Sequence, residues 1–181
     1  MRYVDEYRAP EQVMQLIGHL KMRAALLDYT KERPLRIMEV CGGHTHAIFK
    51  FGLDQLLPEN IEFIHGPGCP VCVLPMGRID SCIDIASQPD VIFCTFGDAM
   101  RVPGKNGSLL QAKARGADIR IVYSPMDALT LAADNPARKV VFFGLGFETT
   151  MPATAITLQQ AKARGVGNFF FFCQHITLIP T

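Results

Sequence analysis

The sequence has no long apolar run among its 181 residues. Its most apolar stretch, Phe169 to Cys173, is five residues long, whereas a helix that crosses a bilayer needs about 18. Residues Met1 to Pro10 carry charges and contain no apolar segment of the kind found in signal peptides. We therefore expect a cytoplasmic protein that does not cross a membrane.

A charge excess of either sign is also missing. The chain carries 18 basic and 17 acidic residues, so its net charge is +1. This balance gives no indication of a nucleic-acid or membrane surface. Hydrophobic residues make up 49% of the sequence, which is enough to bury a core and argues against disorder.

Short apolar runs alternate with segments of helical spacing after Pro34. The runs are Leu35–Val40, Ile61–His65, Val91–Thr95, Ile119–Tyr123, Val140–Phe143 and Phe169–Cys173. Helices are expected over Glu11–Tyr29, His46–Leu57, Met76–Ser87, Ser108–Arg115, Met126–Asp134 and Thr154–Arg164. This order predicts an α/β fold built from repeated βα units, with parallel strands flanked by helices.

Two similar α/β lobes are expected, because Val40–His46 weakly resembles Leu145–Thr150 and each follows an apolar run. The first lobe would span residues 1–136 with an N-terminal helix, and residues 137–181 would begin an incomplete second lobe. A single sheet of six strands is the alternative. Because the sequence stops just after a strand-like segment, we expect it to be part of a longer protein.

Most of the unusual residues follow the expected strands. Ligands in open α/β sheets bind outside the carboxyl ends of the strands, so these loops are the expected site. Cys41-Gly-Gly-His-Thr-His46 follows the first strand, where a thiolate would be stabilised by the positive end of the next helix. His44 and His46 lie within reach of the same turn, although they could simply cap the helix.

Cys69 and Cys72 form a Cys-x-x-Cys pair in the loop after the second strand. This spacing serves dithiol–disulfide exchange, half of a zinc site, or iron ligation. Because a second Cys-x-x-Cys is missing, a zinc ribbon is disfavoured. Six cysteines in a reducing compartment are more often ligands, redox groups or core residues than disulfides.

The remaining candidates are less distinctive. Asp98 and Arg101 follow the third strand and could bind a ligand or form a surface ion pair. Glu148, in Gly-Phe-Glu-Thr-Thr, could belong to a phosphate loop or simply to the first turn of a helix. Cys82, Cys94 and Cys173 are expected to be structural, Cys173 with the least support because Gln174-His175 follows it.

Four motifs in order resemble the HypD family of [NiFe]-hydrogenase maturation factors. They are Cys41–His46, Gly66–Cys72, Phe96–Gly104 and Gly146–Thr150. The resemblance implies a scaffold that works with HypC and holds an Fe(CN)2CO unit, with cyanide delivered by HypE and supplied by HypF. It assigns Cys41 as the iron ligand and places His44 close to the iron.

In the same family the Cys69/Cys72 pair is a redox-active dithiol near the iron. The family also carries a [4Fe-4S] cluster on a cysteine-rich C-terminal region, and this sequence lacks that region. Asp98, Arg101 and Glu148 are candidates for polar contacts to the cofactor or the partner. Two alternatives remain at this point: a thiol–disulfide oxidoreductase that uses Cys69 and Cys72, and an interaction module with structural zinc.

Overall fold

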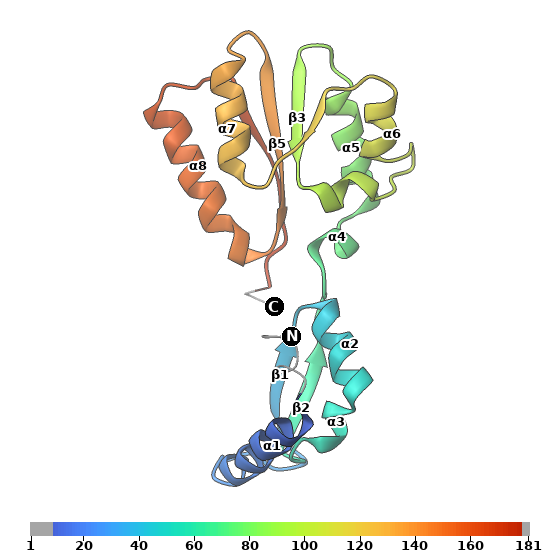
Figure 1. The fold of residues 1–181 in the computed structure, drawn as a ribbon, viewed down its shortest axis with the longest axis vertical. Coiled ribbons are helices and arrows are strands. Elements are labelled where there is room, and N and C mark those ends of the chain that lie inside the picture. Colours follow the sequence, from blue (N-terminus) through green and yellow to red (C-terminus); the bar gives the residue numbers. More distant parts are fainter. Residues whose placement is uncertain (1–8, 179–181) are drawn as a thin grey trace. The chain divides into compact units, whose positions relative to one another are not determined.

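The computed structural model describes residues 9–178 and contains two parallel sheets (Figure 1). The strands are β1 (Leu35–Glu39), β2 (Ile61–His65), β3 (Val91–Thr95), β4 (Ile119–Ile121), β5 (Lys139–Gly146) and β6 (Phe169–His175). The α-helices are α1 (Pro10–Ala24), α2 (Gly42–Phe51), α3 (Leu53–Leu56), α4 (Pro70–Val73), α5 (Met76–Ala86), α6 (Leu109–Ala114), α7 (Pro125–Asp134) and α8 (Met151–Ala163). Two 3-10 helices, η2 (Gly97–Arg101) and η3 (Glu148–Thr150), follow β3 and β5.

The α/β class and the six predicted strands are confirmed. Each apolar run forms a strand whose position agrees within a few residues, because runs of this length in βα units pair in a parallel sheet. The helix predicted over His46–Leu57 differs from the observed structure. It begins earlier, at Gly42, and is divided at Gly52 into α2 and α3.

The chain folds into two compact units, and the boundary between them lies between Cys69 and Pro70. The boundary expected near Pro136 falls inside the second unit, between α7 and β5. Strands β3 and β5 pair directly there, with Phe93 opposite Val141, so residues on both sides of that expected boundary share one sheet. Whether residues 137–181 begin a second lobe stays a prediction.

The first unit contains β1 and β2 in parallel, with Leu35 opposite Ile61 and Glu39 opposite His65. Helices α2 and α3 lie along one side of this pair (Figure 1). The side chain of Asn60 donates a hydrogen bond of 2.8 Å to the carbonyl of Ala24 and thereby ties the end of α1 to the start of β2. The parallel pairing brings the loops that follow β1 and β2 to one edge of the sheet.

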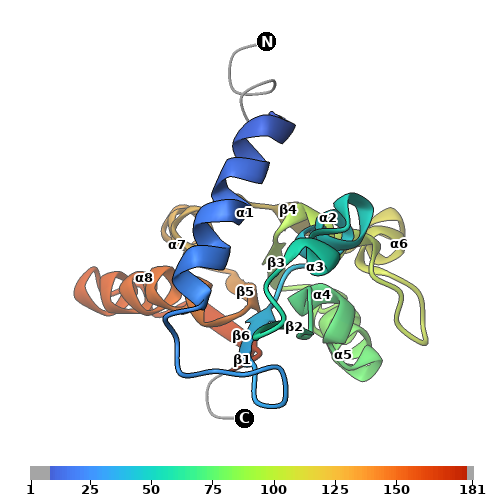
Figure 2. The same cartoon turned by 90° about the horizontal axis from the view of Figure 1, so that it is seen from below.

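The second unit is a sheet in the order β4-β3-β5-β6 with helices on both faces. Helices α5 and α6 cover one face and α7 and α8 the other, as two views at right angles show (Figures 1 and 2). Each face has its own core, with Phe93 and Phe143 toward α5 and Phe142 toward α7. Every residue of β3 is buried, as expected for a strand covered on both faces.

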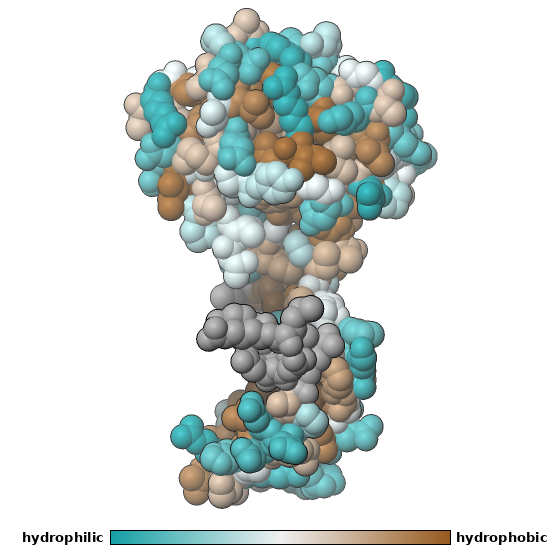
Figure 3. Space-filling view, in the orientation of Figure 1, coloured by the Kyte–Doolittle hydropathy of each residue, from teal (hydrophilic) through white to brown (hydrophobic). Residues whose placement is uncertain are grey.

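The visible surface of the second unit mixes hydrophilic and hydrophobic residues (Figure 3). This mixture agrees with the balanced charge of the sequence. Within residues 9–178, no helix is long and apolar enough to span a bilayer.

Candidate functional site

Cys41 lies directly between the end of β1 and the first turn of α2. It caps that helix in an extended conformation, with φ of −138° and ψ of 120°. Its carbonyl accepts a hydrogen bond of 3.0 Å from the backbone N–H of Thr45. The side chain is partly exposed and carries a free thiol. The thiol therefore stands at a fixed strand-to-helix turn and remains accessible.

A buried carboxylate holds this turn in place. Glu39, whose side chain is 8% exposed, accepts a hydrogen bond of 3.1 Å from the backbone N–H of Cys41 through Oε2. Its Oε1 accepts a hydrogen bond from the hydroxyl of Thr45 and lies 2.8 Å from Nδ1 of His65. Glu39 thus connects β1, α2 and β2 at the edge where the cysteine lies.

The same contacts determine the charge of Glu39. Hydrogen bonds from Thr45 and His65 lower the pKa of this carboxyl from 4.5 to about 2, because they favour the ionised form. The carboxylate is therefore negative at neutral pH, although a buried charge is costly unless it is hydrogen-bonded. The structure provides such partners on both carboxylate oxygens.

The loop that carries Cys69 approaches the loop that carries Cys41. Gly66 donates a backbone hydrogen bond of 2.8 Å to the carbonyl of Glu39. Gly68 adopts a φ of +72°, and a Cβ placed there would lie 3.5 Å from the nitrogen of Gly42. A left-handed backbone at this close contact favours glycine. The two loops therefore meet at one edge of the small sheet.

The histidines of the region differ in their surroundings. His44 and His46 are exposed on the first turns of α2, close in sequence to the thiol of Cys41. His65 is held by Glu39 on one side, and its ring lies 5.0 Å from that of Phe49, centroid to centroid. His65 therefore supports the turn around Cys41 through Glu39.

The other predicted site residues lie in the second unit. Cys72 is exposed on α4, a single helical turn. Asp98 and Arg101 are exposed on η2, where Asp98 accepts a hydrogen bond of 2.9 Å from the backbone N–H of Ala99. Within the described residues no ion pair joins Asp98 to Arg101. Glu148 accepts a hydrogen bond from the backbone N–H of Leu178.

The predicted site residues thus lie at the carboxyl edges of two sheets. Cys41, His44 and Cys69 belong to the edge of the small sheet. Glu148 and Asp98 follow β5 and β3 of the larger one. The sequence could not distinguish one sheet from two, because strands of equal character join either sheet.

Two cysteines are confirmed as core residues. Cys82 and Cys94 are fully buried, on α5 and β3. Burial raises the pKa of each thiol to about 12. Such thiols do not ionise at neutral pH and are unsuited to metal ligation or redox exchange.

A complete metal site is not preformed in residues 9–178. Within this range no group of three or more histidine, cysteine, aspartate or glutamate side chains could hold a metal ion together.

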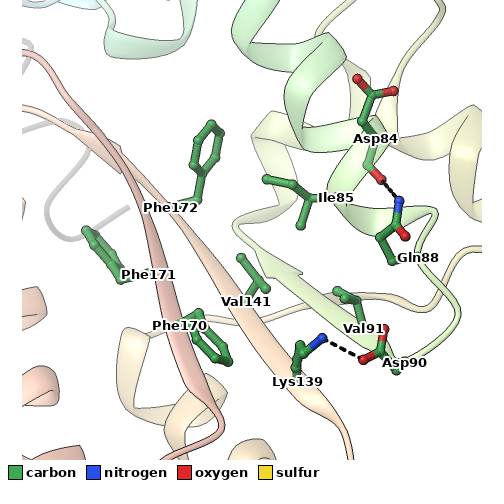
Figure 4. A pocket seen from close by; sticks show the side chains of 10 residues that line it. All are labelled: Asp84, Ile85, Gln88, Asp90, Val91, Lys139, Val141, Phe170, Phe171 and Phe172. Carbon is green, nitrogen blue, oxygen red and sulfur yellow. Dashed lines mark hydrogen bonds and ion pairs between the residues drawn. The ribbon is translucent and has the colours of Figure 1, made fainter.

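A groove of about 550 Å³ in the second unit is distinct from these loops (Figure 4). Its lining includes Phe170, Phe172, Val141 and Ile85, and the ion pair between Lys139 and Asp90, 2.9 Å long, lies at its rim. Lys139 and Val91 are the first residues of β5 and β3. The groove is thus at the amino ends of β3 and β5, and Asp98 and Glu148 follow the carboxyl ends of the same strands.

Glu39 is the functional residue that sequence analysis missed. It lies inside the apolar run Leu35–Val40, and the sequence indicated no role for it. Its position two residues before Cys41 is visible in the sequence, but its pairing with His65 depends on the register of β1 and β2.

Comparison with known proteins gives consistent matches. A family model, HypD, described as "Hydrogenase formation hypA family", matches residues 13–181. The chain is 87% identical over 181 residues to the hydrogenase maturation factor HypD of Escherichia coli K12, covering 100% of this chain and 48% of that relative. It is 61% identical over 178 residues to HypD of Rhodobacter capsulatus, covering 98% and 47%.

A third relative, HypD of Azotobacter vinelandii, is 52% identical over 177 residues, covering 97% of this chain and 45% of that protein. The chain therefore spans about half the length of the curated relatives that it matches. None of these names supports the thiol–disulfide oxidoreductase alternative.

Proposed function

The chain belongs to the HypD family, and from this we propose that it acts in hydrogenase maturation as a scaffold for iron. Together with HypC it would hold the Fe(CN)2CO unit of the [NiFe] active site while that unit is assembled. The observation that carries the proposal is the turn around Cys41, which a buried carboxylate fixes while its thiol stays accessible.

Cys41 would ligate the iron as a thiolate. Soft thiolate ligands suit low-spin ferrous iron that carries cyanide and carbon monoxide. Such a unit brings three ligands of its own, so this chain needs to add few. A need for few protein ligands is consistent with the described residues, among which no three histidine, cysteine, aspartate or glutamate side chains form a group that could hold a metal ion.

Cys69, Cys72 and His44 would act beside the iron. The contact between Gly68 and Gly42 supports this for Cys69, because it brings the Cys69 loop against the Cys41 loop. A dithiol there could supply two electrons or hold the metal temporarily. His44, exposed on the first turn of α2, could donate a hydrogen bond to a ligand of the iron.

Asp98, Arg101 and Glu148 would make polar contacts to cyanide nitrogens or to the partner protein. The support is their position after strands β3 and β5 and the exposure of the first two. Glu148 also accepts a hydrogen bond from the backbone N–H of Leu178, which holds its carboxylate in place.

The partners follow from the family. HypC would share the iron through its own cysteine, and HypE, supplied by HypF, would deliver cyanide in the cytoplasm. The [4Fe-4S] cluster expected for the full-length protein would use ligands outside these 181 residues.

Cells that lack HypD provide the test. The full-length protein should restore hydrogenase activity, Cys41→Ala should abolish that activity, and Cys173→Ala should leave it unchanged, because Cys173 lies at the end of β6, outside the motifs that carry the proposed iron site. Hydrogenase activity that persists with Cys41→Ala would overturn the proposal.

A further inference from the structure

The carboxyl end of β6 holds a thiol and an imidazole in contact. Sγ of Cys173 lies 3.5 Å from Nδ1 of His175, a hydrogen-bonding distance for sulfur. The two residues are two positions apart in a strand and therefore project from the same face. Cys173 is exposed, so a reagent can reach its sulfur.

An aromatic ring stacks on the imidazole of His175. Phe171 stacks on His175 with ring centroids 5.8 Å apart and planes 23° apart. Phe171 can occupy this place because Gly144 on β5 has no side chain: a Cβ there would lie 2.1 Å from the ring. Register supports the arrangement, since β5 and β6 pair Gly144 with Cys173 and Gly146 with His175.

The arrangement of Cys173, His175 and Phe171 suggests a chemical role for the thiol. Burial lowers the pKa of His175, so the imidazole is mainly neutral at neutral pH and can accept a proton. The carboxylate of Glu148, which follows β5, accepts a hydrogen bond from the backbone N–H of Leu178. A neutral imidazole in contact with an exposed thiol can act as a general base that takes up the thiol proton as the sulfur attacks.

We propose that Cys173 and His175 form a reactive thiol site for low-molecular-weight disulfides, separate from the Cys41 turn. Nδ1 of His175 accepts the thiol proton, and the thiolate attacks one sulfur of the disulfide. A new S–S bond forms to Cys173 as the old one breaks. The leaving thiolate departs with the electron pair of that bond and takes up the proton, so the disulfide is reduced and Cys173 becomes a mixed disulfide.

The test is the reaction of the reduced, native protein with oxidised glutathione at neutral pH. Peptide mass spectrometry then measures how fast each cysteine forms a mixed disulfide. Cys173 should react faster than free glutathione thiol exchanges with the same disulfide. His175→Gln should slow Cys173 about fivefold, because glutamine cannot take up the thiol proton during the attack. His19→Gln, at an exposed histidine of the first unit, should leave the rate unchanged.

A second measurement distinguishes activation of the Cys173 thiol by His175 from an effect of the substitution on folding. The rate of Cys173 should rise with pH as His175 loses its proton, and this rise should be absent from His175→Gln. An equal rate and an equal pH profile in wild type and His175→Gln would overturn the proposal. If that variant does not fold, a wild-type Cys173 rate no higher than that of free glutathione would overturn it by itself. Neither result bears on iron binding at Cys41.

Discussion

Glu39 and Cys41 are joined by a hydrogen bond of 3.1 Å from the backbone N–H of the cysteine to a buried carboxylate oxygen. The same carboxylate also binds Thr45 of α2 and His65 of β2. One charged side chain therefore sets the position of the thiol relative to both neighbouring elements.

Replacement of Glu39 by Gln should loosen the turn and reduce iron retention. Glutamine has one oxygen where glutamate has two, so it cannot accept from Cys41 and Thr45 and also contact His65 in the same way. We expect less iron in the purified complex, with the protein still folded. Iron analysis and circular dichroism measure the two outcomes. Glu62→Gln, an exposed glutamate of β2, is the matched control and should keep its iron.

Acid should remove the contribution of Glu39 to folding. The folded-state pKa of this carboxyl is about 2, below its ordinary value of 4.5. Its stabilising effect is therefore complete above pH 4.5 and is lost as the pH falls toward 2. Thermal unfolding across this range should show a smaller loss of stability in Glu39→Gln than in the wild type. Identical pH profiles would contradict the assignment.

Gly68→Ala should destabilise the first unit. The backbone there is left-handed, with φ of +72°, and an L side chain in that conformation costs about 1 kcal/mol or more. Gly18→Ala is the control, because Gly18 lies inside α1 with open space around it. That change should stabilise by about 0.5–1 kcal/mol. Denaturant unfolding of both variants measures the difference.

Gly144→Ala should destabilise the second unit and also slow Cys173. The added methyl would displace the ring of Phe171, and overpacking of this kind costs about 1–3 kcal/mol. Once the ring moves, His175 loses its stacking partner. Gly167→Ala, which meets no atom within 4 Å, should change neither property. A variant with normal Cys173 reactivity despite a displaced Phe171 would separate the two effects.

Alkylation should divide the cysteines by burial. Cys41, Cys69, Cys72 and Cys173 are partly or fully exposed, whereas Cys82 and Cys94 are buried with thiol pKa values raised to about 12. Iodoacetamide should label the first four in the native protein and the last two only after unfolding. Labelling of Cys94 in the native state would show that β3 opens readily.

The fold could be predicted from the sequence because its strands are unusually clear. Runs such as Val91–Thr95 are apolar throughout, and such runs form strands covered on both faces. The grouping of those strands into two sheets could not be predicted. The division falls at Cys69–Pro70, inside a motif, where no change in composition indicates a boundary.

The site was only partly predictable for a related reason. Cys41 and Cys69 follow parallel strands, and the expectation that their loops meet is consistent with the contact between Gly42 and Gly68. Glu39 was missed because its role depends on register: it faces His65 only when β1 and β2 pair as they do. Residue spacing within one strand carries no information about that partner.

The central claim is that Cys41 holds the iron unit. Its most direct test is infrared spectroscopy of the full-length protein purified with HypC in the absence of air. The wild-type complex should show absorption bands of iron-bound cyanide and carbon monoxide, and Cys41→Ala should lose both with its iron. A Cys41→Ala complex that keeps its iron and both kinds of band would contradict the claim.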